Sequence, residues 1–146
     1  MRKVAGKERF ERVFLDTDEL SSCANLGAAI HDALVSAPWL IVVCSPDTPT
    51  SPWVAQEIDT FLEYHDASHV LTVLTAGEPD ESFPERLRSD SRDSMMFAAD
   101  ARADTVREME KTIRRDTVLR VAAPMLGVSY DALRQRRRAW QMRRGM

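Results

Sequence analysis

A tryptophan and a glutamate stand four residues apart in the segment Ser51-Pro-Trp-Val-Ala-Gln-Glu57. Ser51 can cap a helix, and Pro52 suits the first helical position. The sequence therefore predicts that Trp53 and Glu57 share one face of a helix near its N-terminus. A carboxylate there can stabilise positive charge that develops on a bound substrate. The alternative is a surface glutamate that complements the helix dipole.

Two further polar residues follow apolar runs that read as strands. Asp16 ends the run that begins at Arg12, and Ser45 follows the run Trp39–Cys44. In parallel α/β sheets, ligands collect at the carboxyl ends of the strands, so both residues are candidates for ligand contact. Each also has a simpler role, because Asp16 can order the following loop and Ser45 can hold a turn.

The order of the elements predicts a parallel α/β sheet. Apolar runs predict strands at residues 12–16, 39–44, 70–74 and 96–99. Apolar positions at helical spacing predict helices at 25–34, 51–62, 105–125 and from 128 to 133, where the last helix dissolves into an arginine-rich tail. The run 39–44 is continuously apolar, which predicts a strand buried on both faces. Alternating strands and helices imply right-handed crossovers.

The composition suits one compact domain of 146 residues, with 44% hydrophobic and 29% charged residues. No apolar run approaches the roughly 20 residues that span a bilayer, and no signal-peptide pattern follows Met1. Two cysteines are too few for a disulfide scaffold, and Cys44 is expected to be a buried, reduced thiol. The three histidines lack zinc-ligand spacing, so no metal site is expected. Because the cysteines are few and no signal-peptide pattern is present, the expected location of the protein is the cytoplasm.

Charge is distributed unevenly along the chain. Residues 1–99 carry 8 Lys/Arg and 17 Asp/Glu, a net of −9, whereas residues 100–146 carry 12 and 6, a net of +6. An acidic body argues against a nucleic-acid-binding domain. The basic charge is concentrated in Arg134, Arg136, Arg137, Arg138, Arg143 and Arg144. The simpler interpretation is a solvated helix end or frayed tail, and the alternative is weak contact with an anionic membrane or RNA.

Four segments resemble, in order and spacing, the middle of bacterial TIR (Toll/interleukin-1 receptor) domains. They are Phe14-Leu-Asp-Thr-Asp-Glu-Leu20, Leu26-Gly-Ala-Ala-Ile30, Leu40-Ile-Val-Val-Cys-Ser-Pro46 and Ser51-Pro-Trp-Val-Ala-Gln-Glu-Ile58. Later segments, among them Leu126-Gly-Val-Ser-Tyr-Asp-Ala-Leu133, resemble the C-terminal part of one bacterial TIR subgroup. The resemblance implies a flavodoxin-like α/β fold, with a TIR domain at residues 1–133 and an arginine-rich tail at 134–146.

The resemblance also implies a reaction. Many TIR domains cleave the nicotinamide–ribose bond of NAD+, and their catalytic glutamate lies four residues after the tryptophan of a Ser-x-Trp-x-x-x-Glu motif, which Glu57 matches. Trp53 belongs to this motif, and Asp16 matches the family's aspartate at the end of its second strand. With Ser45, these are the candidate NAD+-binding residues. NAD+ is then the substrate, and no cofactor is implied.

The same resemblance implies that other TIR domains are partners. In this family the loop after the second strand, here Asp16–Cys23, mediates self-association and gates the pocket. Neighbouring copies complete each other's sites, so activity is expected from assemblies rather than from monomers. The implied role is NAD+ glycohydrolase activity in bacterial immune signalling.

One feature departs from the family pattern. TIR domains begin with a further strand and helix, and the stretch Met1–Glu11 is too short and too charged to supply both. In the flavodoxin-like order this strand lies between those predicted at 12–16 and 39–44, so the fold is expected to be incomplete at its N-terminus, with two exposed sheet edges. Because that strand contributes to the nicotinamide pocket, its loss motivates a second interpretation, a non-catalytic TIR–TIR interaction module.

Overall fold

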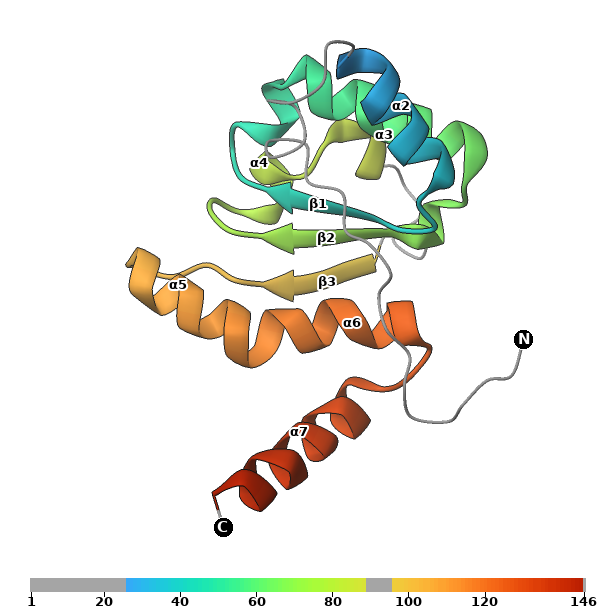
Figure 1. The fold of residues 1–146 in the computed structure, drawn as a ribbon. Helices are drawn as coiled ribbons and strands as arrows, with labels where there is room; N and C mark the ends of the chain where they lie inside the picture. Colours follow the sequence, from blue (N-terminus) through green and yellow to red (C-terminus); the bar gives the residue numbers. More distant parts are fainter. Residues whose placement is uncertain (1–25, 89–95, 146) are drawn as a thin grey trace, which may run out of the picture.

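The computed structural model describes residues 26–88 and 96–145 (Figure 1). Three parallel strands, β1 (Leu40–Cys44), β2 (Val70–Leu74) and β3 (Met96–Asp100), form a sheet in the order β1-β2-β3. The strands predicted at 39–44, 70–74 and 96–99 are confirmed. The strand predicted at 12–16 and the loop Asp16–Cys23 lie outside the described residues.

The register of the sheet brings the strand ends together. β1 and β2 pair without interruption, from Leu40 opposite Val70 to Cys44 opposite Leu74. The pairing of β2 with β3 shifts after Thr72, so that Leu74 lies opposite Asp100. The carboxyl ends of all three strands therefore meet at one edge of the sheet, as the predicted parallel order requires.

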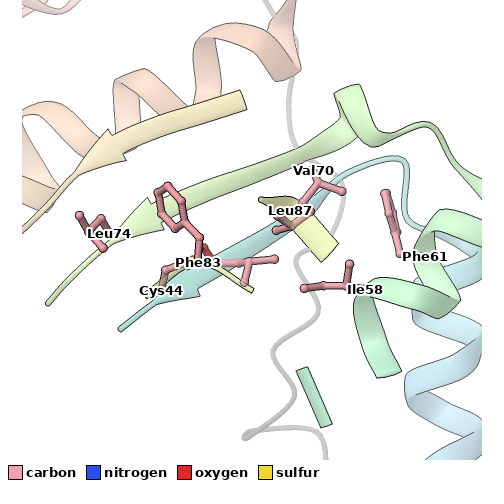
Figure 2. Packing of buried hydrophobic residues seen from close by; sticks show 8 residues of the cluster. Cys44, Ile58, Phe61, Val70, Leu74, Phe83 and Leu87 are labelled. Carbon is pink, nitrogen blue, oxygen red and sulfur yellow. The ribbon is translucent and has the colours of Figure 1, made fainter. Parts of the chain in front are cut away.

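Two helices cover one face of this sheet, α2 (Leu26–Ser36) and α3 (Pro52–Tyr64) (Figure 1). Both predicted helices are confirmed. The short segments α4 (Pro79–Ser82) and η4 (Glu85–Leu87) follow β2 on the same side. One cluster of buried side chains joins α3, β1, β2 and the α4–η4 segment; it consists of Val42, Cys44, Ile58, Phe61, Val70, Leu74, Phe83 and Leu87 (Figure 2).

A long helical path covers the opposite face along β3. It consists of α5 (Val106–Thr112), the π-helical segment η5 (Ile113–Thr117) and α6 (Val118–Leu126) (Figure 1). The helix predicted at 105–125 is confirmed in extent, but the π-helical turn was not predicted. Gly127 ends the path in a left-handed conformation, with φ of 65°, which glycine adopts without strain.

The last helix, α7 (Tyr130–Arg144), is longer than the sequence predicted. The expectation that it dissolves after residue 133 was wrong. Ser129 caps the helix by accepting a hydrogen bond from the Ala132 N–H, and arginine is a good helix former. The arginine-rich segment is therefore helical, and the division of the chain between 133 and 134 remains a prediction.

The prediction that the strand at 39–44 is buried on both faces was also wrong. Val42 and Cys44 are buried beneath α3, whereas Ile41 is 40% exposed and Val43 is 61% exposed. The cause is that α5 and α6 lie along β3, at the far side of the sheet from β1 (Figure 1). Within the described residues, β1 is thus an edge strand with one apolar face exposed.

Burial should make Cys44 chemically inert. Its thiol is free and buried, as predicted, and burial raises its pKa from 9.0 to about 11. In a Cys23→Ser variant at about pH 8, a thiol reagent should modify the native protein at least roughly tenfold more slowly than the urea-unfolded chain. Equal rates would contradict the buried position.

Candidate active site

The start of α3 positions the two residues singled out by the sequence. Ser51 caps the helix, accepting a hydrogen bond from the Val54 N–H at 3.4 Å, and proline follows at the first position. Ile58 and Phe61 have no exposed surface, so they fix the rotation of the helix against the sheet. This rotation leaves Trp53 74% exposed and Glu57 half-buried.

The exposure of Trp53 distinguishes contact with a ligand from packing in the core. A tryptophan that packs in the core would bury most of its large ring. Trp53 is absent from the buried cluster, and it stands one helical turn before Glu57. Its position therefore fits contact with a ligand or a partner better than it fits core packing.

The loop after β1 is held by a threonine that the sequence analysis missed. Thr48 is buried, and its Oγ1 donates to the Val43 carbonyl at 3.3 Å and accepts from the Ser45 N–H at 2.9 Å. The Ser45 Oγ lies 3.5 Å from the same oxygen. Ser45 thus takes part in a turn, and its contact with a ligand remains a prediction. The sequence shows only a threonine in a loop with three prolines, which does not reveal this role.

The loop after β2 lies directly against the loop after β1. The Thr75 N–H and Oγ1 both donate to the Cys44 carbonyl, at 2.9 and 3.0 Å. Gly77 has φ of 71°, and a Cβ atom there would come within 2.5 Å of Pro46 Cγ and 2.6 Å of Ser82 Oγ. Only glycine allows this approach, so Gly77 determines how closely the two loops pack.

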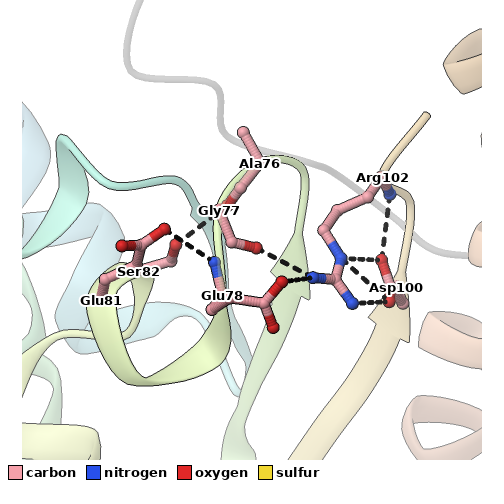
Figure 3. A network of polar contacts seen from close by, with 7 residues as sticks. All are labelled: Ala76, Gly77, Glu78, Glu81, Ser82, Asp100 and Arg102. Atoms are coloured by element: carbon pink, nitrogen blue, oxygen red, sulfur yellow. Dashed lines mark hydrogen bonds and ion pairs between the residues drawn. The ribbon is translucent and has the colours of Figure 1, made fainter. Parts of the chain in front are cut away.

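An arginine after β3 connects a third loop to the loop after β2 (Figure 3). The Arg102 Nη1 donates to the Gly77 carbonyl and to Glu78, both at 3.0 Å, while Nη2 donates to Asp100 at 2.7 Å. The Arg102 hydrogen bonds lower the pKa of Asp100 below its ordinary value. We call this arrangement of Glu78, Asp100 and Arg102 the strand-end clasp. None of these three residues was singled out from the sequence.

Three of the four candidate site residues lie in the described part of the chain. The structure places Trp53, Glu57 and Ser45 after the end of β1, on the side of the sheet where the loops gather. Asp16 lies outside the described residues. Within residues 26–88 and 96–145, no group of three or more His, Cys, Asp or Glu side chains is arranged to hold a metal ion. The chemistry available at this edge is that of a half-buried carboxylate beside an exposed indole.

A parallel sheet with helices on both faces, and candidate residues at its carboxyl edge, defines a flavodoxin-like α/β domain. The family model described as "Thoeris protein ThsB, TIR-like domain" matches residues 4–80, which is more than half of the chain. The chain therefore belongs to this family of bacterial TIR domains. The resemblance seen in the sequence is confirmed.

The chain also matches part of a curated protein whose name refers to a TIR domain. The chain is 35% identical over 72 residues to "NAD(+) hydrolase ApTIR" of Actinoplanes sp. (strain ATCC 31044 / CBS 674.73 / SE50/110). This match covers 49% of the chain and 10% of the relative, so the chain spans about a tenth of that protein. No solved structure matches the chain significantly.

Replacing Gly77 should loosen the contact between the first two loops. Gly77→Ala forces a Cβ atom against Pro46 and a side chain into left-handed backbone, which costs about 1 to 3 kcal/mol. Gly27→Ala is the matched control, because nothing lies within 4 Å of the added atom and alanine favours helix α2. Urea unfolding followed by circular dichroism should show destabilisation for Gly77→Ala only.

The strand-end clasp should weaken in acid. Because the folded-state pKa of Asp100 is lowered, its contribution to stability is present above the ordinary pKa of about 4 and is lost as pH falls through the lowered value. The difference in urea midpoint between wild type and Arg102→Gln should therefore be larger at about pH 7 than at about pH 3. A difference that stays constant with pH would show that the Asp100 charge is not involved.

Proposed function

We propose that this chain is a TIR signalling domain that cleaves the nicotinamide–ribose bond of NAD+, with Glu57 as the catalytic residue. The observation that carries the proposal is the position of Glu57. It is half-buried in the second turn of α3, which begins at the carboxyl edge of the sheet, and it shares a helix face with exposed Trp53. Family membership and the printed name of the Actinoplanes relative support the same reaction.

The chemistry requires little beyond one well-placed carboxylate. When the bond from ribose C1′ to the nicotinamide nitrogen breaks, its electron pair goes to the ring, which leaves as neutral nicotinamide. The ribose then carries oxocarbenium character, which the Glu57 carboxylate stabilises. Water adds through its oxygen to C1′ and releases a proton, giving ADP-ribose. Glu57 also orients the ribose hydroxyls or this water.

The remaining candidates complete the proposed substrate site. The Trp53 indole offers a flat apolar surface for the nicotinamide ring, since aromatic rings stack favourably. Ser45 and Asp16 are proposed to contact the rest of NAD+, with Ser45 contributing from the turn that Thr48 holds. NAD+ is consumed in this reaction and is not retained as a cofactor.

The proposed setting is bacterial immune signalling in the cytoplasm. TIR domains self-associate, and we assign this contact in the present chain to the loop region Asp16–Cys23. None of the helices in the described part of the chain is long and apolar enough to cross a membrane. Because neighbouring copies are expected to complete each other's sites, turnover should rise with protein concentration.

Loss of NAD+ cleavage on replacing Glu57 is the central test. The purified chain, at high concentration and with a crowding agent, should consume NAD+ and release nicotinamide, measured by liquid chromatography. Glu57→Ala and Glu57→Gln should lower the rate by about 100-fold or more, because each removes the stabilising charge. Glu63→Ala, which changes an exposed glutamate of the same helix, should leave the rate unchanged.

Two outcomes would contradict the enzyme proposal. If wild type releases no nicotinamide even when oligomerised, the chain does not catalyse this reaction. If Glu57→Ala is as active as wild type, another residue carries the catalysis.

A second function, a non-catalytic TIR–TIR interaction module, is favoured by a separate observation. Ile41 and Val43 are exposed on one face of β1, and contact with another TIR domain would bury both apolar side chains. If light scattering shows self-association while wild type releases no nicotinamide, the module is the function. A replacement of Val43 by Ser should then weaken self-association without unfolding the chain.

A further inference from the structure

A groove lies between η5 and α7, apart from the carboxyl edge of the sheet. Its volume is about 490 Å³, within the range of roughly 300 to 1,000 Å³ typical of small-molecule sites. Four arginines line it, namely Arg115 from η5 and Arg134, Arg137 and Arg138 from α7. Asp116 is the acidic residue in the lining. The NAD+ cleavage proposed above makes no use of this groove.

One arginine holds the groove in shape. The Arg137 Nη1 donates to the carbonyls of Arg114 and Arg115, at 2.5 and 3.2 Å. These carbonyls belong to the π-helical segment, where the regular α-helical hydrogen-bond pattern is interrupted. Arg137 therefore fastens α7 to η5 through its Nη1, and because carbonyls are neutral its positive charge still adds to that of the groove.

The acidic residue of the groove, Asp116, already has hydrogen-bond partners. Asp116 accepts a hydrogen bond from the Tyr130 hydroxyl through Oδ1 and one from Arg120 Nε through Oδ2, at 2.6 Å. The Arg120 guanidinium also lies 4.2 Å from the centre of the Tyr130 ring. Burial by itself would raise the pKa of Asp116, but the bonds from Tyr130 and Arg120 and the charge of Arg134 lower it overall. Asp116 is therefore ionised and already paired at neutral pH.

Three further guanidinium groups line the groove without a hydrogen-bonded anion, and the charge of one of them, Arg134, acts on Asp116 without direct contact. Arg115, Arg134 and Arg138 are exposed, and none of them makes a side-chain hydrogen bond or ion pair within the described residues. They come from two elements that Arg137 joins. Like charges gathered in one groove repel each other, so a bound anion with several charges would relieve the repulsion.

We propose that this groove binds a small diphosphate group, either inorganic pyrophosphate or the diphosphate of a nucleotide, through Arg115, Arg134 and Arg138. Guanidinium groups match phosphate oxygens in paired hydrogen bonds, which makes arginine the preferred residue for such anions. Leu119 also lines the groove and offers apolar contact to a nucleoside attached to the diphosphate.

The structure favours a small ligand over a membrane or a nucleic acid. The exposed apolar residues of α7, Trp140 and Met142, are two positions apart and so point to opposite sides of the helix, which gives no continuous apolar stripe for a membrane. Arg136 and Arg143 do not line the groove. A polynucleotide attracted by the whole helix would engage those two arginines equally.

The test compares two double variants with the same loss of charge on the same helix. Binding of pyrophosphate, ADP and adenosine to the full chain is measured by isothermal titration calorimetry at physiological salt. Arg134→Gln/Arg138→Gln should weaken the binding of pyrophosphate and ADP by roughly tenfold or more, because it removes two guanidinium–phosphate contacts. Arg136→Gln/Arg143→Gln should change it by less than about twofold. Circular dichroism confirms that both variants fold.

The three ligands distinguish the source of the diphosphate. Adenosine alone should not bind. Tighter binding of ADP than of pyrophosphate would assign the groove to a nucleotide, and equal binding would assign it to the diphosphate alone. Absence of binding by both phosphates would overturn the proposal. So would equal weakening in the two double variants, or tighter binding of single-stranded RNA or phosphatidylserine vesicles that depends on Arg136 and Arg143.

Discussion

The burial of two α3 side chains against the sheet is the constraint on which the candidate active site depends. Ile58 and Phe61 have no exposed surface, and they contact the buried face of β1 and β2. Since a helix has one rotation that buries a given pair of residues, this packing also decides which side chains face outward. Trp53 and Glu57 are placed by residues that perform no chemistry themselves.

The loops around this edge are held by bonds between them rather than by a core of their own. Thr75 binds the end of β1, Gly77 allows contact with Pro46, and the strand-end clasp joins the loop after β3. Each of these contacts is partly exposed, so each contributes modestly. Together they connect the three strand ends, which gives the edge a defined shape while its loops remain near solvent.

The sequence predicted what depends on local patterns. The strands from Leu40 and Val70, the cap at Ser51 and the stop at Gly127 each follow from neighbouring residues. Features that depend on contacts between residues far apart in the chain were not predicted. The exposure of Val43 depends on where α5 and α6 lie, and the strand-end clasp joins residues 24 positions apart. The length of α7 was missed because its many arginines resemble a solvated tail. Trp53 and Glu57 could be singled out as candidates because one motif contains both residues, whereas Thr48 belongs to no such motif.

The π-helical segment has a consequence for the geometry of everything after it. A π-turn holds one more residue than an α-helical turn, and each residue of an α-helix advances the chain by about 100°. The extra residue in Ile113–Thr117 thus sets the phase of α6, whose Ala123 is buried, relative to α5. If the same residues wound as a regular α-helix, every position after this segment would be turned by about 100°, and Ala123 would leave its buried position. The π-turn therefore takes up one extra residue without turning α6 away from the sheet, and α7 follows from an α6 that keeps its phase.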